Sequence, residues 1–443
     1  MKQKLKITGI LFISFIVHVA GQNVSLSLSE AIRNGLENNP GIQNARIDTQ
    51  KAQSQLVEQQ SKLYPQVNAY SDFYYYYGLP KLVVPGEIFG QSGDIPVEFG
   101  TKYDWSSGFR ATQVLYNQSY FTSLKIARQN TEVEHLNLQQ KKEELIYQIS
   151  LVYYLCLTTR QQTKHLSTTL KNMDKLLQIT KLQEQVGIIR KVDREQVLVD
   201  QNNLQTEIDN LNQLYEQQIN LLKYLTGINL NINIELTDSL TVPESINEDV
   251  QAWENRTEMK LLDAQLERAR LSLKMSKQEY FPVLSGFAQY YYQGQRDRFD
   301  FFDGGNDRFY KVGFVGISLS IPIFNGFEKR EKMRQHKLAI QQLQNSRIHT
   351  LGFFSKEHKN AWLQYENNQT TLRRQEENIR IAEGNYRIVL LEYQQQTTSL
   401  SDLLRAQNSL TEACLSYDNA LLQLKNAALD LIKAKGELLT KTN

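Results

Sequence analysis

Proline is nearly absent from most of this 443-residue chain, and its distribution constrains the fold more than any other feature of the sequence. All 8 prolines lie in three neighbourhoods, and the stretches 97–242 and 323–443 contain none. Between Phe109 and Thr226 the only glycine is Gly187. Because a run of strands and turns needs more helix-breaking residues than this, both stretches are predicted to form very long helices.

The long stretches also carry an apolar repeat of 3.5 residues. Leu145, Ile149, Val152 and Cys156 begin one such run, with alternating steps of four and three residues. This spacing is typical of coiled-coil seams. A helix from about residue 118 to 186 would be roughly 100 Å long at the usual rise per residue, which predicts a long rod or the wall of a tube.

The chain contains the same order of segments twice, which predicts a duplicated domain with repeats at 22–243 and 244–443. In each repeat an opening helical segment leads to a proline, Pro65 or Pro282, and then to a tyrosine-rich alternating segment. Each opening carries a capping-box pattern, SLSE from Ser27 and SINE from Ser245. The expected strands lie near 66–77 and 107–116 in the first repeat and near 283–292 and 312–321 in the second.

The expected strands have the length and alternation of membrane-barrel strands. In the last one, Val315, Ile317 and Leu319 alternate with Gly316 and Ser318, and aromatic clusters lie where an interfacial girdle would fall. A soluble β-subdomain is the alternative. Four strands cannot close a barrel, and an open sheet in lipid leaves backbone groups unpaired. Two, three or four copies would supply eight, twelve or sixteen strands, of which only the larger two numbers leave an open lumen.

The first 21 residues resemble a secretory signal peptide. Three lysines precede an apolar run that ends in the small residues Ala20 and Gly21. An N-terminal membrane anchor is the alternative, although the apolar run is short for one. The chain carries 50 basic and 48 acidic residues, which is not the charge of a nucleic-acid-binding protein. We therefore expect an exported protein that does not bind nucleic acid.

The sequence shows no catalytic motif. It lacks a phosphate-binding glycine loop, HExxH, GxSxG and CxxC. Glu357, His358 and His349 could suggest a metal site, but the spacing leaves the histidines poorly phased on one helix, which favours a solvated surface. Cys156 and Cys414 lie at apolar helical positions, as buried thiols do. We expect no enzyme activity, no metal and no cofactor.

A set of motifs in fixed order resembles the TolC-like outer membrane efflux proteins over residues 25 to 440. The set comprises LSEAI with NNP, the strand starts LYP and YFP, the strand ends VLYN and PIFN, the turn VGIIRKVD, the segment YLTGIN and the duplication itself. The resemblance implies a mainly α fold with a membrane β-barrel portion: a homotrimer with a twelve-stranded outer-membrane barrel and an α-helical barrel formed by long antiparallel coiled coils.

The resemblance also implies a location and partners. The protein would lie in the outer membrane of a Gram-negative bacterium, in contact with its lipid, with a large periplasmic portion. It would be the exit duct of a tripartite efflux or type I secretion system. Its partners would be a periplasmic membrane-fusion adaptor and an inner-membrane transporter of the RND, ABC or MFS type. The alternative function is a secreted coiled-coil scaffold or adhesin without channel activity.

By the same resemblance, the helical turns carry the functional residues. The adaptor-docking turn corresponds to Val186, Gly187 and Ile188, whereas QQT at 395–397 departs from the family pattern. Gln396 replaces the glycine of the second turn, and because glutamine tolerates a left-handed backbone poorly, we expect that turn to differ in shape.

The family's gate corresponds to Asp193 and Tyr393. The arginine that accompanies them in the family is replaced by Thr398, so we expect a weaker or differently wired latch. The constricting acidic ring corresponds to Asp402, and a second acidic position is Arg405 in this chain. Either the ring attracts cations, or Arg405 neutralises Asp402 by an i,i+3 pair; the sequence leaves both open.

Overall fold

The computed structural model describes residues 24–90, 92–247, 256–303 and 309–441. The expected signal peptide and Glu248 of the second capping-box pattern lie outside these residues. The helices are α1 Leu28–Asn38, α2 Pro40–Ser61, α3 Gln118–Gln185, α4 Lys191–Thr226, α5 Thr257–Gln278, α6 Glu328–Gln394, α7 Leu400–Lys435 and α8 Leu438–Lys441, with one 3-10 turn at Gly86–Phe89. Among the described residues, none of the helices combines the length and apolar character needed to cross a membrane.

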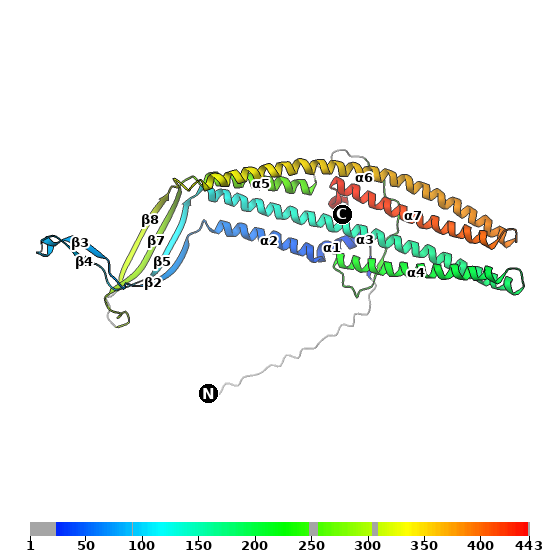
Figure 1. Ribbon diagram of the computed structural model, residues 1–443, viewed down its shortest axis with the longest axis horizontal. Coiled ribbons are helices and arrows are strands. Elements are labelled where there is room, and N and C mark those ends of the chain that lie inside the picture. The colour runs from blue at the N-terminus through cyan, green and yellow to red at the C-terminus, as the bar shows by residue number, and fades with distance from the viewer. Residues whose placement is uncertain (1–23, 91, 248–255, 304–308, 442–443) are drawn as a thin grey trace, which may run out of the picture. The chain divides into compact units, whose positions relative to one another are not determined.

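The strands form three small sheets. A parallel pair joins β1 Val24–Leu26 to β6 Ile234–Leu236. An antiparallel hairpin joins β3 Lys81–Pro85 to β4 Asp94–Glu98. The largest sheet has the order β2-β5-β7-β8 and is antiparallel throughout (Figure 1). Its strands are β2 Gln66–Tyr75, β5 Tyr103–Tyr116, β7 Val283–Arg296 and β8 Tyr310–Ser320.

The chain forms two compact units that do not follow the order of the sequence. The first comprises Met1–Asn44, Gln139–Thr257 and Leu351–Asn443, and the second comprises Ala45–Leu138 and Glu258–Thr350. Each unit takes segments from both halves of the chain. The expected long helices are confirmed, since α3 and α6 run without interruption for 68 and 67 residues.

The first unit packs two helical hairpins, α3–α4 and α6–α7, together with α1 and the β1–β6 pair. Ser27 begins α1 with the expected capping box, in which its hydroxyl accepts from Glu30 N–H and the Glu30 carboxylate accepts from Ser27 N–H. The buried Tyr153 donates from its hydroxyl to Leu26 O at 3.0 Å or to Asp238 Oδ2 at 2.8 Å. This bonding ties α3 to the short parallel sheet.

The two cysteines belong to the first unit and both carry free thiols. Cys156 is fully buried on α3, and Cys414 is half-buried on α7. Burial raises the pKa of the Cys156 thiol to about 12. The thiol is therefore protonated and unreactive at neutral pH.

In the second unit, the four-stranded sheet separates apolar from polar side chains by face. The register aligns Val67, Ala111, Ala288 and Val315 across the four strands, and on the opposite face it aligns the polar Asn68, Arg110 and Gln289 with Phe314. The apolar face is solvent-exposed, with Val315 at 83% and Ile317 at 70%.

The polar face carries side-chain hydrogen bonds that join neighbouring strands. Gln289 donates from its amide to the Tyr70 hydroxyl, and Gln293 Nε2 donates to Asp104 Oδ2 at 2.9 Å. The guanidinium of Arg110 lies 5.0 Å from the centre of the Tyr70 ring. Alternation along each strand therefore produces one mainly apolar face and one face that is mainly polar.

The β3–β4 hairpin was not expected from the sequence, which predicts strands near 66–77 and 107–116 and none between them. Pro85 and Pro96 lie within its strands, and proline usually marks edge strands or positions outside a sheet. In a two-stranded hairpin both strands are edges, so proline is tolerated there.

Candidate functional site

The α3–α4 turn reverses the chain through a left-handed glycine. Gly187 has φ of 76°. Gly187 N–H donates to Glu184 O at 3.0 Å, and Ile188 N–H donates to Gln183 O at 2.8 Å. These two bonds define a Schellman motif. The turn exposes the apolar side chains of Val186 and Ile188 at 70% and 56%, so the predicted docking residues form an apolar tip.

The α6–α7 turn has the same backbone motif with a glutamine in the left-handed position. Gln396 has φ of 61°. Gln396 N–H donates to Tyr393 O at 3.0 Å, and Thr397 N–H donates to Glu392 O at 2.9 Å. The expectation that this turn would differ in shape is therefore wrong. The hydrogen bonds of the helix end outweigh the steric cost of a left-handed side chain, which is about 1–2 kcal/mol.

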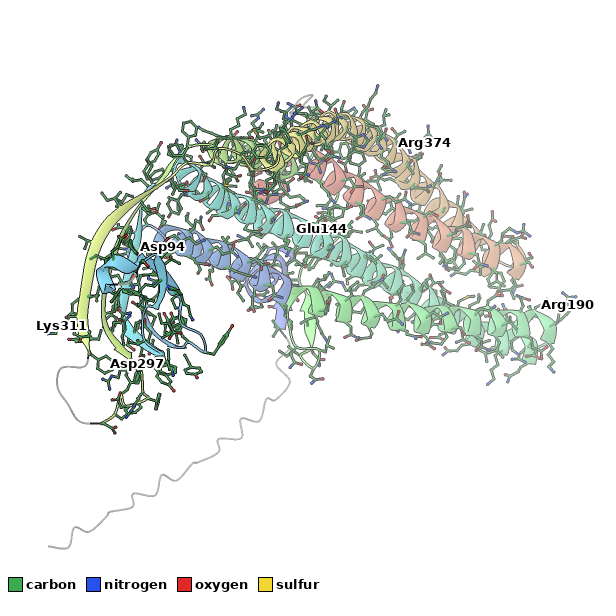
Figure 2. The ribbon with its side chains drawn as sticks, turned by 60° about the vertical axis from the view of Figure 1, so that its left-hand side comes forward. Asp94, Glu144, Arg190, Asp297, Lys311 and Arg374 are labelled. Carbon is green, nitrogen blue, oxygen red and sulfur yellow. The ribbon has the colours of Figure 1, made fainter. Side chains whose placement is uncertain are left out.

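Asp193 is held by an arginine of its own turn. The Arg190 guanidinium donates to Asp193 Oδ1 at 2.8 Å, and Arg190 backbone N–H donates to Asp193 Oδ2 at 3.1 Å. These hydrogen bonds lower the pKa of Asp193 below its ordinary value. In Figure 2 Arg190 is labelled at the tip of the α3–α4 hairpin. Asp193 therefore has a guanidinium that contacts both of its carboxylate oxygens. This guanidinium belongs to Arg190 of the first turn and not to a residue of the second turn.

Tyr393 joins the two hairpins through Gln183 and not through Asp193, the other predicted gate residue. Its hydroxyl donates to Gln183 Oε1 of α3 at 3.0 Å. Burial raises the pKa of the Tyr393 phenol, so it remains a neutral donor at neutral pH. Asp193, Tyr393 and Thr398 line one groove of about 520 Å³ between the turns. The groove brings them together, but no hydrogen bond joins these three residues to one another.

Asp402 lies in the first turn of α7, bonds to the N-cap Ser399 and pairs with the next helical turn. Ser399 donates from its hydroxyl to Asp402 Oδ2 at 2.6 Å, and Arg405 Nη1 lies 3.5 Å from Asp402 Oδ1. Thr398 Oγ1 donates to the same carboxylate at 3.4 Å. The Ser399 bond, followed by the charge of Arg405, lowers the pKa of Asp402. The i,i+3 pair that the sequence left open is therefore present.

Apolar side chains also connect the two hairpins. Met173 of α3, Val197 of α4 and Leu404 of α7 form one buried cluster. In the first turn, Arg194 Nε donates to Glu184 Oε2 at 2.6 Å. Buried apolar contact and one tyrosine hydrogen bond therefore hold the turns of one chain together.

Sequence reasoning missed several of these residues. Ser399 and Asp402 match a capping pattern that the sequence displays, and Arg190 has the same three-residue spacing from Asp193. The sequence could not identify Gln183 as a hydrogen-bond partner of Tyr393, because its helix carries many glutamines and nothing in the pattern distinguishes this one. The expectation of a solvated surface is wrong for His358, which is 4% exposed. Glu357 is paired with Arg256.

No group of three or more histidine, cysteine, aspartate and glutamate side chains in the described part of the chain is arranged to hold a metal ion. The chemistry at the turns is that of hydrogen bonds, ion pairs and apolar contact. Such an arrangement can hold two helical hairpins together and can release them when a partner competes for the same groups.

A family model described as outer membrane efflux protein matches residues 31–227 and 250–437. Among curated protein sequences, none matches the chain. Three solved structures illustrate the structural likeness. They are the outer membrane protein VceC of Vibrio cholerae, the open state of the MtrE outer membrane channel of Neisseria gonorrhoeae and the CmeC outer membrane channel of Campylobacter jejuni.

VceC matches with 15% identity and a TM-score of 0.72, covering 92% of this chain and 96% of its own. MtrE matches with 17% identity and a TM-score of 0.74, covering 93% and 89%. CmeC matches with 18% identity and a TM-score of 0.69, covering 93% and 85%. At these identities the likeness establishes the fold.

Proposed function

Since the chain belongs to the outer membrane efflux protein family, we propose that it is the outer membrane duct of a tripartite efflux or type I secretion system. The resemblance inferred from its motifs is confirmed by this membership. In the proposed role the chain conducts substrates passively, and the energy comes from an inner-membrane transporter of the RND, ABC or MFS type through a periplasmic membrane-fusion adaptor.

The two faces of the β2-β5-β7-β8 sheet carry this proposal. Val315 and Ile317 leave the apolar face exposed, whereas Arg110 and Gln289 lie in the hydrogen-bonded polar face. A sheet with one lipid-facing and one water-facing side is typical of transmembrane barrels. A soluble β-subdomain would cover its apolar face with other elements.

The open edges of the sheet favour assembly with other copies. β2 and β8 are the outer strands and each has one unpaired side. In lipid, each unpaired backbone group costs several kcal/mol because no water is present to bond it. Pairing of β8 with β2 of the next copy would satisfy both edges, and three copies would give a twelve-stranded barrel in the outer membrane of a Gram-negative bacterium.

The helical turns would then form the periplasmic end of the duct. The exposed tip at 186–188 suits an adaptor that buries apolar surface. We propose that the Tyr393–Gln183 hydrogen bond and the cluster of Met173, Val197 and Leu404 hold the closed state. We also propose that Asp402, together with Arg405, sets the charge at the constriction.

The proposed membrane role can be tested on one strand by two matched substitutions. Val315→Lys places a charge on the apolar face, where such a charge costs about 2–4 kcal/mol near the bilayer midplane. Ser318→Lys places it on the opposite face of the same strand. We expect Val315→Lys to abolish heat-modifiable trimers in outer-membrane fractions and Ser318→Lys to preserve them.

Native mass spectrometry of the wild-type protein in lipid nanodiscs provides the second measurement, with a trimer as the expected result. Recovery of the wild type as a soluble monomer would overturn the proposal and favour the scaffold or adhesin. Equal assembly of the two lysine variants would contradict the assignment of the lipid-facing side.

A further inference from the structure

A second groove lies on the helices a short distance from the tip, between α3, α6 and α7. Its volume is about 410 Å³, which falls in the range of small-molecule sites, about 300–1,000 Å³. Its apolar lining includes the side chains of Met173, Leu176, Ile179, Tyr386, Leu390 and Tyr393. Aromatic rings and a methionine thioether form a surface suited to a flat aromatic ligand.

One polar side chain in this groove forms no hydrogen bond. Gln407 of α7 lines the groove and is only 5% exposed. Among the hydrogen bonds of the described residues, its side-chain amide makes none. The amide atoms of Gln407 are not among the enclosed side-chain atoms that lack a partner, so they face the solvent of the groove. A ligand with a hydrogen-bonding group can reach them there.

A positive charge also lines the groove. Lys175 of α3 is exposed there, and its ammonium forms no ion pair within the described parts of the chain. Neither an aspartate nor a glutamate is among the residues that line the groove. The charge of the lining therefore favours an anion over a cation.

We propose that this groove binds a small planar aromatic carboxylate. The ring system lies among Tyr386, Tyr393 and the neighbouring apolar side chains, the Gln407 amide bonds to a polar atom of the ligand, and Lys175 pairs with its carboxylate. This binding is separate from the transport role and does not depend on it.

Because of the position of the groove, a bound ligand would affect the contact between the two hairpins. Gln183 and Tyr393 line both this groove and the groove between the turns. A bound ligand would therefore lie beside the hydrogen bond that joins the two hairpins. By filling space between α3 and α6 it would brace them against separation.

The test uses 6-fluoro-2-naphthoate as the probe and the full-length protein in lipid nanodiscs, with binding followed by fluorine NMR. Empty nanodiscs correct for partition of the probe into lipid. We expect saturable binding with one site per chain. The neutral 6-fluoro-2-naphthamide should bind about fivefold more weakly, because it lacks the charge that pairs with an exposed lysine.

Substitutions place the probe in the groove. Lys175→Gln should weaken binding about fivefold, whereas Lys171→Gln, the same change one turn away and outside the lining, should leave it unaltered. Gln407→Leu should weaken binding about tenfold through loss of the amide. Ile179→Trp, which starts from an exposed side chain and fills the groove without changing the core, should abolish binding.

The inference is overturned by any of three results. These are the absence of saturable binding to the wild-type protein, equal weakening by Lys175→Gln and Lys171→Gln, and unaltered binding to Ile179→Trp. Because Lys175 and Ile179 are exposed, their variants remain informative if Gln407→Leu fails to fold.

Discussion

The two helical turns of the first unit share one backbone motif but are stabilised by different chemistry. Around the α3–α4 turn the side chains pair by charge, with Arg190 on Asp193 and Arg194 on Glu184. The two turns can be aligned on their left-handed residues, Gly187 and Gln396. In this alignment Leu403 and Leu404 of the α6–α7 turn, both buried, correspond to Arg194 and Glu195 of the α3–α4 turn.

This difference shows that the helix ends determine the backbone geometry of the turn and not its side chains. The Schellman hydrogen bonds satisfy carbonyl groups that any helix end leaves free, so both turns adopt the same geometry with glycine or glutamine in the left-handed position. The side chains that follow can vary. The α3–α4 turn therefore relies on partly exposed ion pairs, which are weak and screened by salt. The α6–α7 turn adds buried leucines to its exposed Asp402–Arg405 pair.

The largest expected contrast concerns Leu404 and its counterpart Glu195. Leu404→Ala removes buried contacts with Met173 and Val197, so we expect a loss of about 2–4 kcal/mol in the free energy of unfolding. Glu195→Ala should change it by less than about 0.5 kcal/mol, because the Glu195 side chain is half-exposed and lies outside the buried cluster. Urea titration of the helical circular dichroism signal measures both. Equal effects would refute the contrast between burial and charge.

The left-handed residues give the next contrast. Gly187→Gln should destabilise the first turn by about 1 kcal/mol, and Gln396→Gly should stabilise the second by up to about the same amount. The cause is the steric cost of a side chain at positive φ. The same urea titration applies, and a change of the same sign in both variants would contradict the shared geometry.

A smaller contrast is expected between the residues that precede α7 and α4. Ser399→Ala should cost about 1 kcal/mol, because its hydroxyl accepts from Asp402 N–H at the helix start. Arg190→Ala removes an exposed ion pair and should cost less than Ser399→Ala. Raising the salt concentration should shrink the Arg190 effect and leave the Ser399 effect unaltered. The opposite salt dependence would be inconsistent with the two kinds of stabilisation.

The pH dependence should be the same at the two turns. Hydrogen bonds lower the pKa of both Asp193 and Asp402. The stability that these carboxylates contribute is therefore fully present above the unfolded value of about 3.9 and is lost as the pH falls through the lower folded pKa. The wild type should therefore be more stable than Asp193→Asn and Asp402→Asn at neutral pH, and this difference should shrink only as the pH falls below about 3.9. A difference that is already lost above pH 5 would contradict these lowered pKa values.

The smallest expected effect is on ion selectivity. Asp402→Asn should reduce the cation preference of the duct in planar bilayers, and Arg405→Gln should increase it, because Arg405 pairs with that carboxylate. Reversal potentials in a salt gradient measure the change. Selectivity that neither substitution alters would remove Asp402 from the constriction.

Much of the fold was predictable because it depends on local pattern. The absence of proline and the apolar repeat predict α3 to within one residue at its end, and alternation identifies β8 with its apolar and polar faces. The β3–β4 hairpin was missed because Pro85 and Pro96 argue against strands, although both are tolerated where each strand is an edge.

The site was less predictable because it depends on partners from distant segments. The sequence identified Tyr393 and the possible Asp402–Arg405 pair, since the latter spans one helical turn. It did not identify Gln183 as the partner of Tyr393, 210 positions away. It also missed Arg190. This residue of the first turn donates its guanidinium to Asp193, whereas Thr398 in the second turn has no guanidinium to donate.

Single-channel recording in planar bilayers tests most directly whether the chain forms a duct gated at its helical turns. We expect the purified wild-type trimer to insert and to conduct in discrete small steps. Tyr393→Phe, which removes only the hydroxyl that bonds Gln183, should give larger or longer openings. Asp193→Asn should have a weaker effect, since its partner lies in the same turn. Absence of discrete conductance from both the wild type and Tyr393→Phe would contradict the proposal that this protein is a channel.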